Sequence, residues 1–118
     1  EKPLTNEDTL HFVTDPNYFI SPVIKKLNNQ PYNFTLENNY PNPFNPTTTI
    51  AFNVPRSDKI QLQVVNVLGQ RVATLVDGYV LKGRYRVLFD GSGLASGIYF
   101  YTLTQNNRSI TRRMMLIK

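Results

Sequence analysis

The chain has 118 residues and a mass of 13.6 kDa, which suits one modest domain, and its 41% hydrophobic content excludes a wholly disordered chain. It contains no cysteine, which excludes disulfides and thiolate metal sites, and none of its apolar runs approaches the roughly 20 residues of a membrane helix. The net charge of +5 comes from scattered basic residues, and no helix-turn-helix or base-stacking motif accompanies them, so nucleic-acid binding is not indicated.

Residues 1–39 are polar and repeatedly interrupted by proline. The apolar pieces TLHFV and YFISPVI are too short to predict strands. We therefore expect residues 1–39 to be a tail or linker, or the end of an upstream passenger, and place the folded domain at residues 40–118. No charged-then-apolar leader opens the chain, so for an exported protein we expect a removed leader or a fragment of a longer chain.

The first two predicted strands alternate apolar and polar residues. TTTIAFNVP, residues 47–55, places Ile50, Phe52 and Val54 on one face. KIQLQVVNV, residues 59–67, likewise places Ile60, Leu62 and Val64 on the inward face. LGQ then predicts a turn in which Gly69 adopts positive φ.

The remaining sequence continues this rhythm of short strands and turns. RVATLV, residues 71–76, is the expected hairpin partner, and Asp77-Gly78 is a predicted turn. The further strands are expected in RYRVLFD, IYFYTLTQ and SITRRMMLIK, with a glycine-rich loop, GSGLASG, before the second of them. Short strands without a convincing helix predict an all-β protein, an antiparallel sandwich.

Five motifs in order resemble the C-terminal sorting domain of type IX secretion cargo, the Por secretion family. They are YPNPFNPTTTIAFNVP, IQLQVVNVLGQRVATLV, GRYRVLFDG, ASGIYFYTL and RRMMLIK, which span residues 40–118. The resemblance implies an immunoglobulin-like β-sandwich of about seven strands at the end of exported proteins of the Bacteroidetes. It also implies partners: an outer-membrane translocon, and in many members a sortase-like peptidase that attaches the passenger to anionic lipopolysaccharide at the cell surface.

The resemblance also indicates which residues form the signal. They are Pro41, Asn42, Pro43, Gly69, Gly83, Gly91, Gly97 and Tyr99, with Met114, Met115, Leu116, Ile117 and Lys118 in the last strand. Phe89 stands where relatives often carry Trp, and we expect it to remain a core aromatic. Prolines 41, 43 and 46 fix φ and favour extended neighbours, which predicts that the chain enters the sandwich stretched.

Basic residues recur near the predicted last turns and strands. Lys82, Arg84 and Arg86 are spaced by two and would share one strand face. With Arg112 and Arg113 they could form a basic patch facing lipopolysaccharide or the translocon. The alternative is an ordinary solvated sheet face.

No pattern in the sequence indicates catalysis or a cofactor. His11 is the one histidine, and Asp58, Asp77 and Asp90 are each expected in a separate turn, so neither a triad nor a carboxylate pair is predicted. DGSG lacks the further carboxylates that calcium requires. We therefore expect a protein that is not an enzyme and holds no metal.

Two other functions remain open. The chain could be a structural or adhesive subunit of an extracellular filament, a homo-oligomer in which TLHFVTD or YFISPVI adds to a neighbour's sheet edge. A carbohydrate-binding module would instead expose Tyr79, Tyr99 or Tyr101 as stacking platforms.

Overall fold

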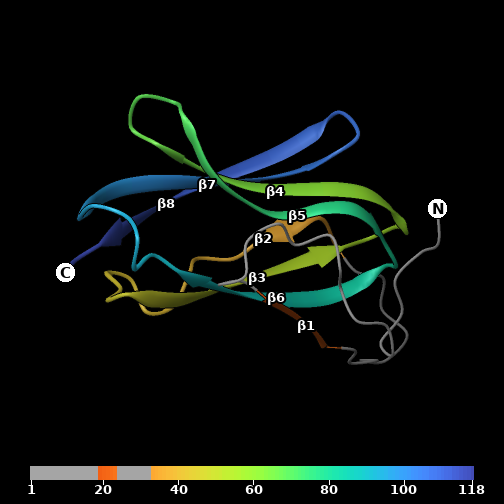
Figure 1. Ribbon diagram of the computed structural model, residues 1–118. Helices are drawn as coiled ribbons and strands as arrows, with labels where there is room; N and C mark the ends of the chain where they lie inside the picture. The colour runs from red at the N-terminus through yellow and green to blue at the C-terminus, as the bar shows by residue number, and fades with distance from the viewer. Residues whose placement is uncertain (1–18, 24–32) are drawn as a thin grey trace.

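The computed structural model describes residues 19–23 and 33–118. These residues form two stacked, four-stranded antiparallel sheets, with strand orders β1-β6-β3-β2 and β5-β4-β7-β8 (Figure 1). The strands are β1 (Phe19–Val23), β2 (Thr35–Leu36), β3 (Thr47–Val54), β4 (Asp58–Asn66), β5 (Arg71–Val80), β6 (Gly83–Asp90), β7 (Gly97–Gln105) and β8 (Arg108–Leu116). The predicted all-β antiparallel sandwich is confirmed.

The core lies between the sheets and follows the alternation in the sequence. Along β3 every second residue is buried, and β4, β6 and β7 repeat this pattern. Phe89 is buried, as expected for the position where relatives often carry Trp. Phe52 and Tyr85 pair across neighbouring strands with their ring centroids 5.5 Å apart. Buried residues of both sheets form one hydrophobic core, as in a β-sandwich.

The predicted turn at Asp77-Gly78 is wrong. Both residues lie inside β5, where Asp77 pairs with Gln61 and Gly78 with Ile60. The ladder to β4 overrides the local turn signal, and the chain reverses only after Val80. Asp58 and Asp90 lie at the ends of strands, beside turns, whereas Asp77 lies within one.

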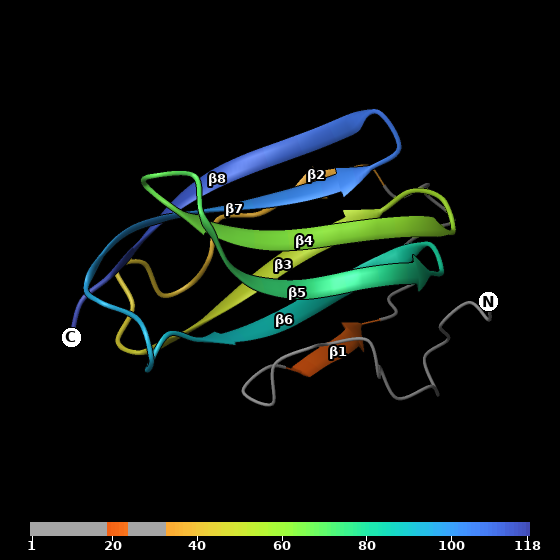
Figure 2. The ribbon, with the colours of Figure 1, turned by 45° about the horizontal axis from the view of Figure 1, so that its top comes forward.

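Residues before position 40 also take part in the sandwich. β1 pairs antiparallel with β6 and forms one edge of its sheet, as Figure 2 shows. β2 pairs with β3 at the opposite edge, and Leu36 is only 1% exposed. TLHFV and His11 lie outside the described residues, so the interpretations that rest on them are not addressed by the structure. Within the described part of the chain, no helix is long and apolar enough to cross a membrane.

Candidate functional site at the end of the last strand

The proline-rich segment pairs with the end of β8. The Phe44 N–H donates to the Met115 carbonyl oxygen at 2.9 Å, and the Ile117 N–H donates to the Phe44 carbonyl oxygen at 2.9 Å. These bonds make a parallel bridge between Phe44 and Leu116. The Asn42 Oδ1 accepts the Met115 N–H at 3.0 Å. Two motifs far apart in the sequence therefore form one structural unit.

The sequence around Phe44 explains why the pairing covers so few residues. Prolines have no N–H to give to a ladder, so Phe44, between Pro43 and the Asn45-Pro46 pair, supplies the donor. Its ring is 1% exposed and lies 5.9 Å from the Phe89 ring, centroid to centroid. The chain bends on both sides of Phe44, and the peptide bonds before Pro41, Pro43 and Pro46 are cis. The predicted stretched entry is wrong, since burial of Phe44 draws the segment inward.

Gly91 packs directly on this bridge. A Cβ at Gly91 would lie 3.1 Å from Leu116 Cδ2 and 3.3 Å from Phe44 Cε2. The Gly91 N–H also donates to the Pro46 carbonyl oxygen at 2.8 Å. Gly91 thus permits close packing of the three segments that meet there, because a side chain would press on Leu116 and Phe44.

The loop between β6 and β7 holds the last residue. The Lys118 N–H donates to Ser96 Oγ at 3.0 Å, and its ammonium donates to the Ser92 carbonyl oxygen. The Asp90 carboxylate accepts bonds from the Ser92 hydroxyl and N–H, and these bonds lower the pKa of Asp90. Lys118 is therefore held through its backbone by Ser96 and through its side chain by Ser92.

Two of the three tyrosines considered for sugar stacking are buried. The Tyr99 hydroxyl donates to the Ala95 carbonyl oxygen at 2.7 Å, and the Tyr101 hydroxyl donates to the Glu37 carbonyl oxygen at 2.7 Å. Burial raises the pKa of Tyr101 to about 12. Tyr79 is half-buried and donates to the Ser57 carbonyl oxygen at 3.3 Å. Tyr99 and Tyr101 therefore cannot serve as exposed platforms, which corrects that part of the carbohydrate interpretation.

A family model for the secretion system C-terminal sorting domain matches residues 38–118, most of the chain. The chain belongs to this family. It therefore carries a C-terminal sorting signal for type IX secretion, which directs export across the outer membrane to the cell surface or extracellular space and interacts with the type IX machinery. The resemblance drawn from the five motifs is confirmed. The curated proteins and the solved structures yielded no match.

Most of the positions singled out by resemblance meet at one end of the sorting domain. Gly97 pairs with Leu116, and Tyr99 pairs with Met114. Gly69 lies in the β4–β5 turn with φ of 81°, as predicted. Gly83 pairs with Val54, at the other end of β6 from Asp90. The last strand ends at Leu116 rather than at Lys118.

Exposed apolar side chains distinguish this end of the sorting domain. Met114 and Leu116 are buried, whereas Met115 is 39% and Ile117 47% exposed. Met115 pairs with Ile98, whose side chain shares its outward face. Val67 and Leu68 are exposed in the β4–β5 turn. Met115 and Ile117 therefore leave apolar surface exposed at the end of β8, where a partner could bury it.

The five basic residues of the predicted patch lie on different parts of the domain. Arg84 and Arg86 point outward from β6, and Arg84 pairs with Glu37 at 2.9 Å. Lys82 precedes β6, in the turn after β5. Arg112 and Arg113 belong to β8 in the other sheet. Because neighbouring strand residues point to opposite faces, Arg112 and Arg113 diverge. The structure does not gather the five into one surface.

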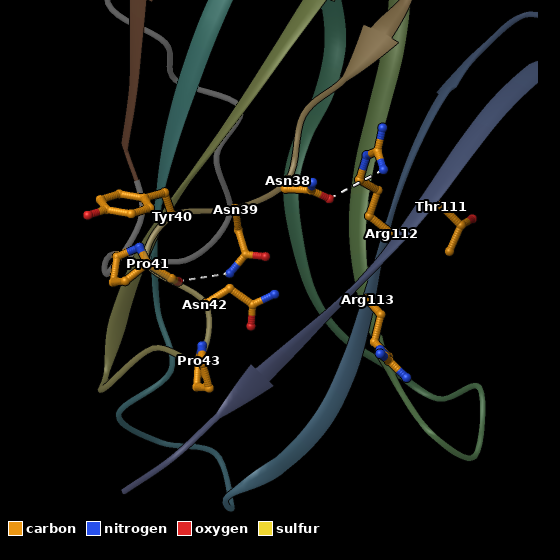
Figure 3. Close-up of a pocket in the computed structure, with 9 residues that line it drawn as sticks. All are labelled: Asn38, Asn39, Tyr40, Pro41, Asn42, Pro43, Thr111, Arg112 and Arg113. Atoms are coloured by element: carbon orange, nitrogen blue, oxygen red, sulfur yellow. Dashed lines mark hydrogen bonds between the residues drawn. The ribbon is translucent and has the colours of Figure 1, made fainter.

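A polar groove runs between the proline-rich segment and β8 (Figure 3). It is lined by Asn38, Asn39, Tyr40, Pro41, Asn42, Pro43, Thr111, Arg112 and Arg113. Asn39 is 3% exposed, and its Nδ2 donates to the Pro41 carbonyl oxygen and to Thr48 Oγ1. The Arg112 guanidinium donates to the Leu36 carbonyl oxygen and to Asn38 Oδ1.

Sequence reasoning missed Asn39, Tyr40 and Phe44 as site residues. Phe44 had a usable signal, because it is a lone large apolar residue among prolines and asparagines. Nothing in the sequence around Asn39 indicated a role, because that role depends on a hydrogen bond to Thr48 in a neighbouring segment. Within the described residues, no group of three or more potential metal ligands was found. What the site offers chemically is backbone and amide hydrogen bonding, two guanidinium groups and apolar surface.

Proposed function

We propose that the chain is a non-catalytic sorting signal recognised as a folded unit at the end of β8. In this proposal, the outer-membrane translocon binds the surface around Met115 and Ile117. A sortase-like peptidase then cleaves upstream of Asn33 and attaches the passenger to anionic lipopolysaccharide at the cell surface. Cleavage there separates the passenger from β2 to β8, so none of these strands has to unfold for the cut.

The observation that carries the proposal is the bridge between Phe44 and Leu116. It buries Leu116 and fixes the backbone of β8, so the alternating residues Met115 and Ile117 face solvent at a defined place. Because the end of β8 is already ordered, little conformational entropy is lost when a partner binds it. The same bridge couples the presentation of the signal to correct folding.

The test is a reporter fused to the full chain, residues 1–118, in a host with a working type IX system. We expect the reporter on the cell surface, with a new C-terminus upstream of Asn33 by mass spectrometry. Replacing Met115 and Ile117 by serine should reduce surface delivery several-fold while the fusion still folds. Surface delivery that survives removal of residues 114–118 contradicts recognition at β8. Surface reporter that keeps an intact domain contradicts only the cleavage step.

The pairing of β1 with β6 favours a second candidate, a structural subunit of an extracellular assembly. β1 is an edge strand from the N-terminal segment, so the same strand of another copy could occupy its place on β6. Purified full chain would then form dimers or filaments that disappear when residues 19–23 are deleted. Monomers at all concentrations in small-angle scattering contradict this candidate.

A further inference from the structure

The groove between the proline-rich segment and β8 combines three features that the sorting signal does not use. It lies along an unpaired strand edge, it carries positive charge, and one wall holds a buried amide oxygen without a donor. Each feature comes from different residues.

β8 is an edge strand, with β7 on one side only. Met115 and Ile117 bond away from β7, to Asn42 and Phe44. Because backbone groups in an antiparallel strand alternate in direction with a period of two, the N–H and C=O of Thr111 and Arg113 also face away from β7. They line the groove directly upstream of the Phe44 bridge. An extended chain placed there would continue the pairing that Phe44 begins.

The charge of the lining indicates the chemistry of the occupant. Among the nine lining residues are two arginines and no acidic residue. Arg112 is held by Leu36 and Asn38, whereas Arg113 is exposed and no bond from its guanidinium is recorded within the described part of the chain. Guanidinium groups form strong, often bidentate hydrogen bonds with carboxylates and phosphates, and of these two an unmodified peptide carries carboxylates.

The wall formed by the proline-rich segment contains a buried oxygen atom that lacks a hydrogen-bond donor from the residues that the structure describes. Asn39 lines the groove, and its Oδ1 is buried in that wall with no hydrogen-bond donor among the described residues. Both bonds of its Nδ2 fix the orientation of the amide, so this oxygen cannot exchange places with the nitrogen. A buried acceptor without a donor is costly, and the backbone N–H of a bound peptide is a donor of the required kind.

We infer that this groove is a docking site for an acidic segment of another protein, bound in extended conformation as an added strand on β8. The guest backbone pairs with Thr111 and Arg113. Its carboxylates, spaced by two residues and so on one face of the guest strand, meet the exposed Arg113. One guest N–H reaches the Asn39 Oδ1. The site does not depend on export, so its failure and that of the sorting proposal are distinguishable.

The test uses the full chain and a labelled octapeptide in which valine and aspartate alternate. A second octapeptide, in which valine and lysine alternate, is the charge control. In fluorescence anisotropy we expect the acidic peptide to bind and the basic one to bind at least roughly tenfold more weakly. On binding, amide exchange by NMR should slow at Thr111 and Arg113. The amides of Arg112 and Met114, which face β7, should not change.

Arg113→Glu should weaken the acidic peptide by about tenfold or more and favour the basic peptide. Arg86→Glu, an equal charge change at an exposed position of the other sheet, should leave the affinity within about twofold. Thr111→Pro removes an edge N–H without breaking a backbone hydrogen bond to β7, although it also removes the hydroxyl contact with Thr102, and it should abolish strand addition. Equal losses in Arg113→Glu and Arg86→Glu, protection on β1 or β5 instead of β8, or no binding at millimolar peptide would overturn the inference.

Discussion

Phe44 and Leu116 lie side by side in a parallel bridge, and the side chain of each is 1% exposed. Phe44 belongs to the segment that enters the sandwich, and Leu116 ends its last strand. The bridge therefore joins the beginning and the end of the matched family region. Because both side chains enter the same core, the position of the last residues depends on the packing of Phe44.

Phe44→Ala should lower the free energy of unfolding by about 3–5 kcal/mol, because it removes a ring packed on Phe89 and leaves a cavity beside Leu116. Urea denaturation followed by circular dichroism measures this loss. Tyr40→Ala is the control, since Tyr40 is 81% exposed and should change stability by no more than about 0.5 kcal/mol. A loss below about 1 kcal/mol for Phe44→Ala would contradict a structural bridge.

Two glycines of one loop give a matched test of close packing. Gly91→Ala should destabilise the domain by about 1–3 kcal/mol, since its Cβ would press on Leu116 and Phe44. Gly93→Ala should be neutral or slightly stabilising, because nothing lies within 4 Å of its Cβ position. The comparison is between the urea midpoints of the two variants, provided that the free energy of unfolding depends equally on urea concentration in both. Equal midpoints would show that the loop moves aside at no cost.

The sequence predicted what depends on local pattern. Alternation placed Ile50, Phe52 and Val54 in the core, because residues on one strand face share one environment. The Gly69 turn followed from a residue that tolerates positive φ. The family motifs then indicated the region where the signal lies, although not how its parts meet.

What the sequence did not predict depends on pairing between distant segments. Asp77-Gly78 has turn chemistry, yet the ladder to β4 keeps it in a strand. Phe44 reads as part of a proline-rich entry, and only the position of β8 gives it a partner. Asn39 likewise acquires its role from Thr48 and the groove. Such contacts carry no periodic signal along the chain.

The residues just before position 40 should be needed for stability. Residues 40–118 alone lack the buried Leu36 and the carbonyl oxygens that bind Tyr101 and Arg112. We expect this fragment to be less stable than residues 33–118 by about 3 kcal/mol or more. Leu36→Ala in the longer fragment should account for about 2–5 kcal/mol by itself. We propose that the folding unit includes β2 and so begins at or before residue 33, and equal stability of both fragments would restore a boundary at 40.

Exposed and buried residues at the end of β8 should behave differently. The double change Met115→Ser and Ile117→Ser should shift the free energy of unfolding by about 1 kcal/mol or less, because both side chains are partly in water. It should nevertheless reduce surface delivery several-fold. Leu116→Ala should cost about 2–5 kcal/mol and reduce delivery through misfolding. The readouts are denaturation and surface labelling of the same fusions. If the double variant is as unstable as Leu116→Ala, then Met115 and Ile117 act through folding and are not a separate recognition surface.

Tyr101 should make the domain sensitive to alkali. Its pKa is raised from a usual value of 10.0 to about 12 by burial, so the unfolded chain ionises first as the pH rises. The stabilising effect is complete below pH 10 and is lost between about pH 10 and 12, at 1.36 kcal/mol per unit, or about 2–3 kcal/mol in all. Tyr101→Phe cannot ionise, and it lacks the bond to the Glu37 carbonyl oxygen, so it should be less stable than the wild type at pH 8. Urea denaturation of both proteins from pH 8 to 12 should show this gap closing and then reversing. A gap that stays constant with pH would mean that Tyr101 ionises equally in the folded and unfolded chains.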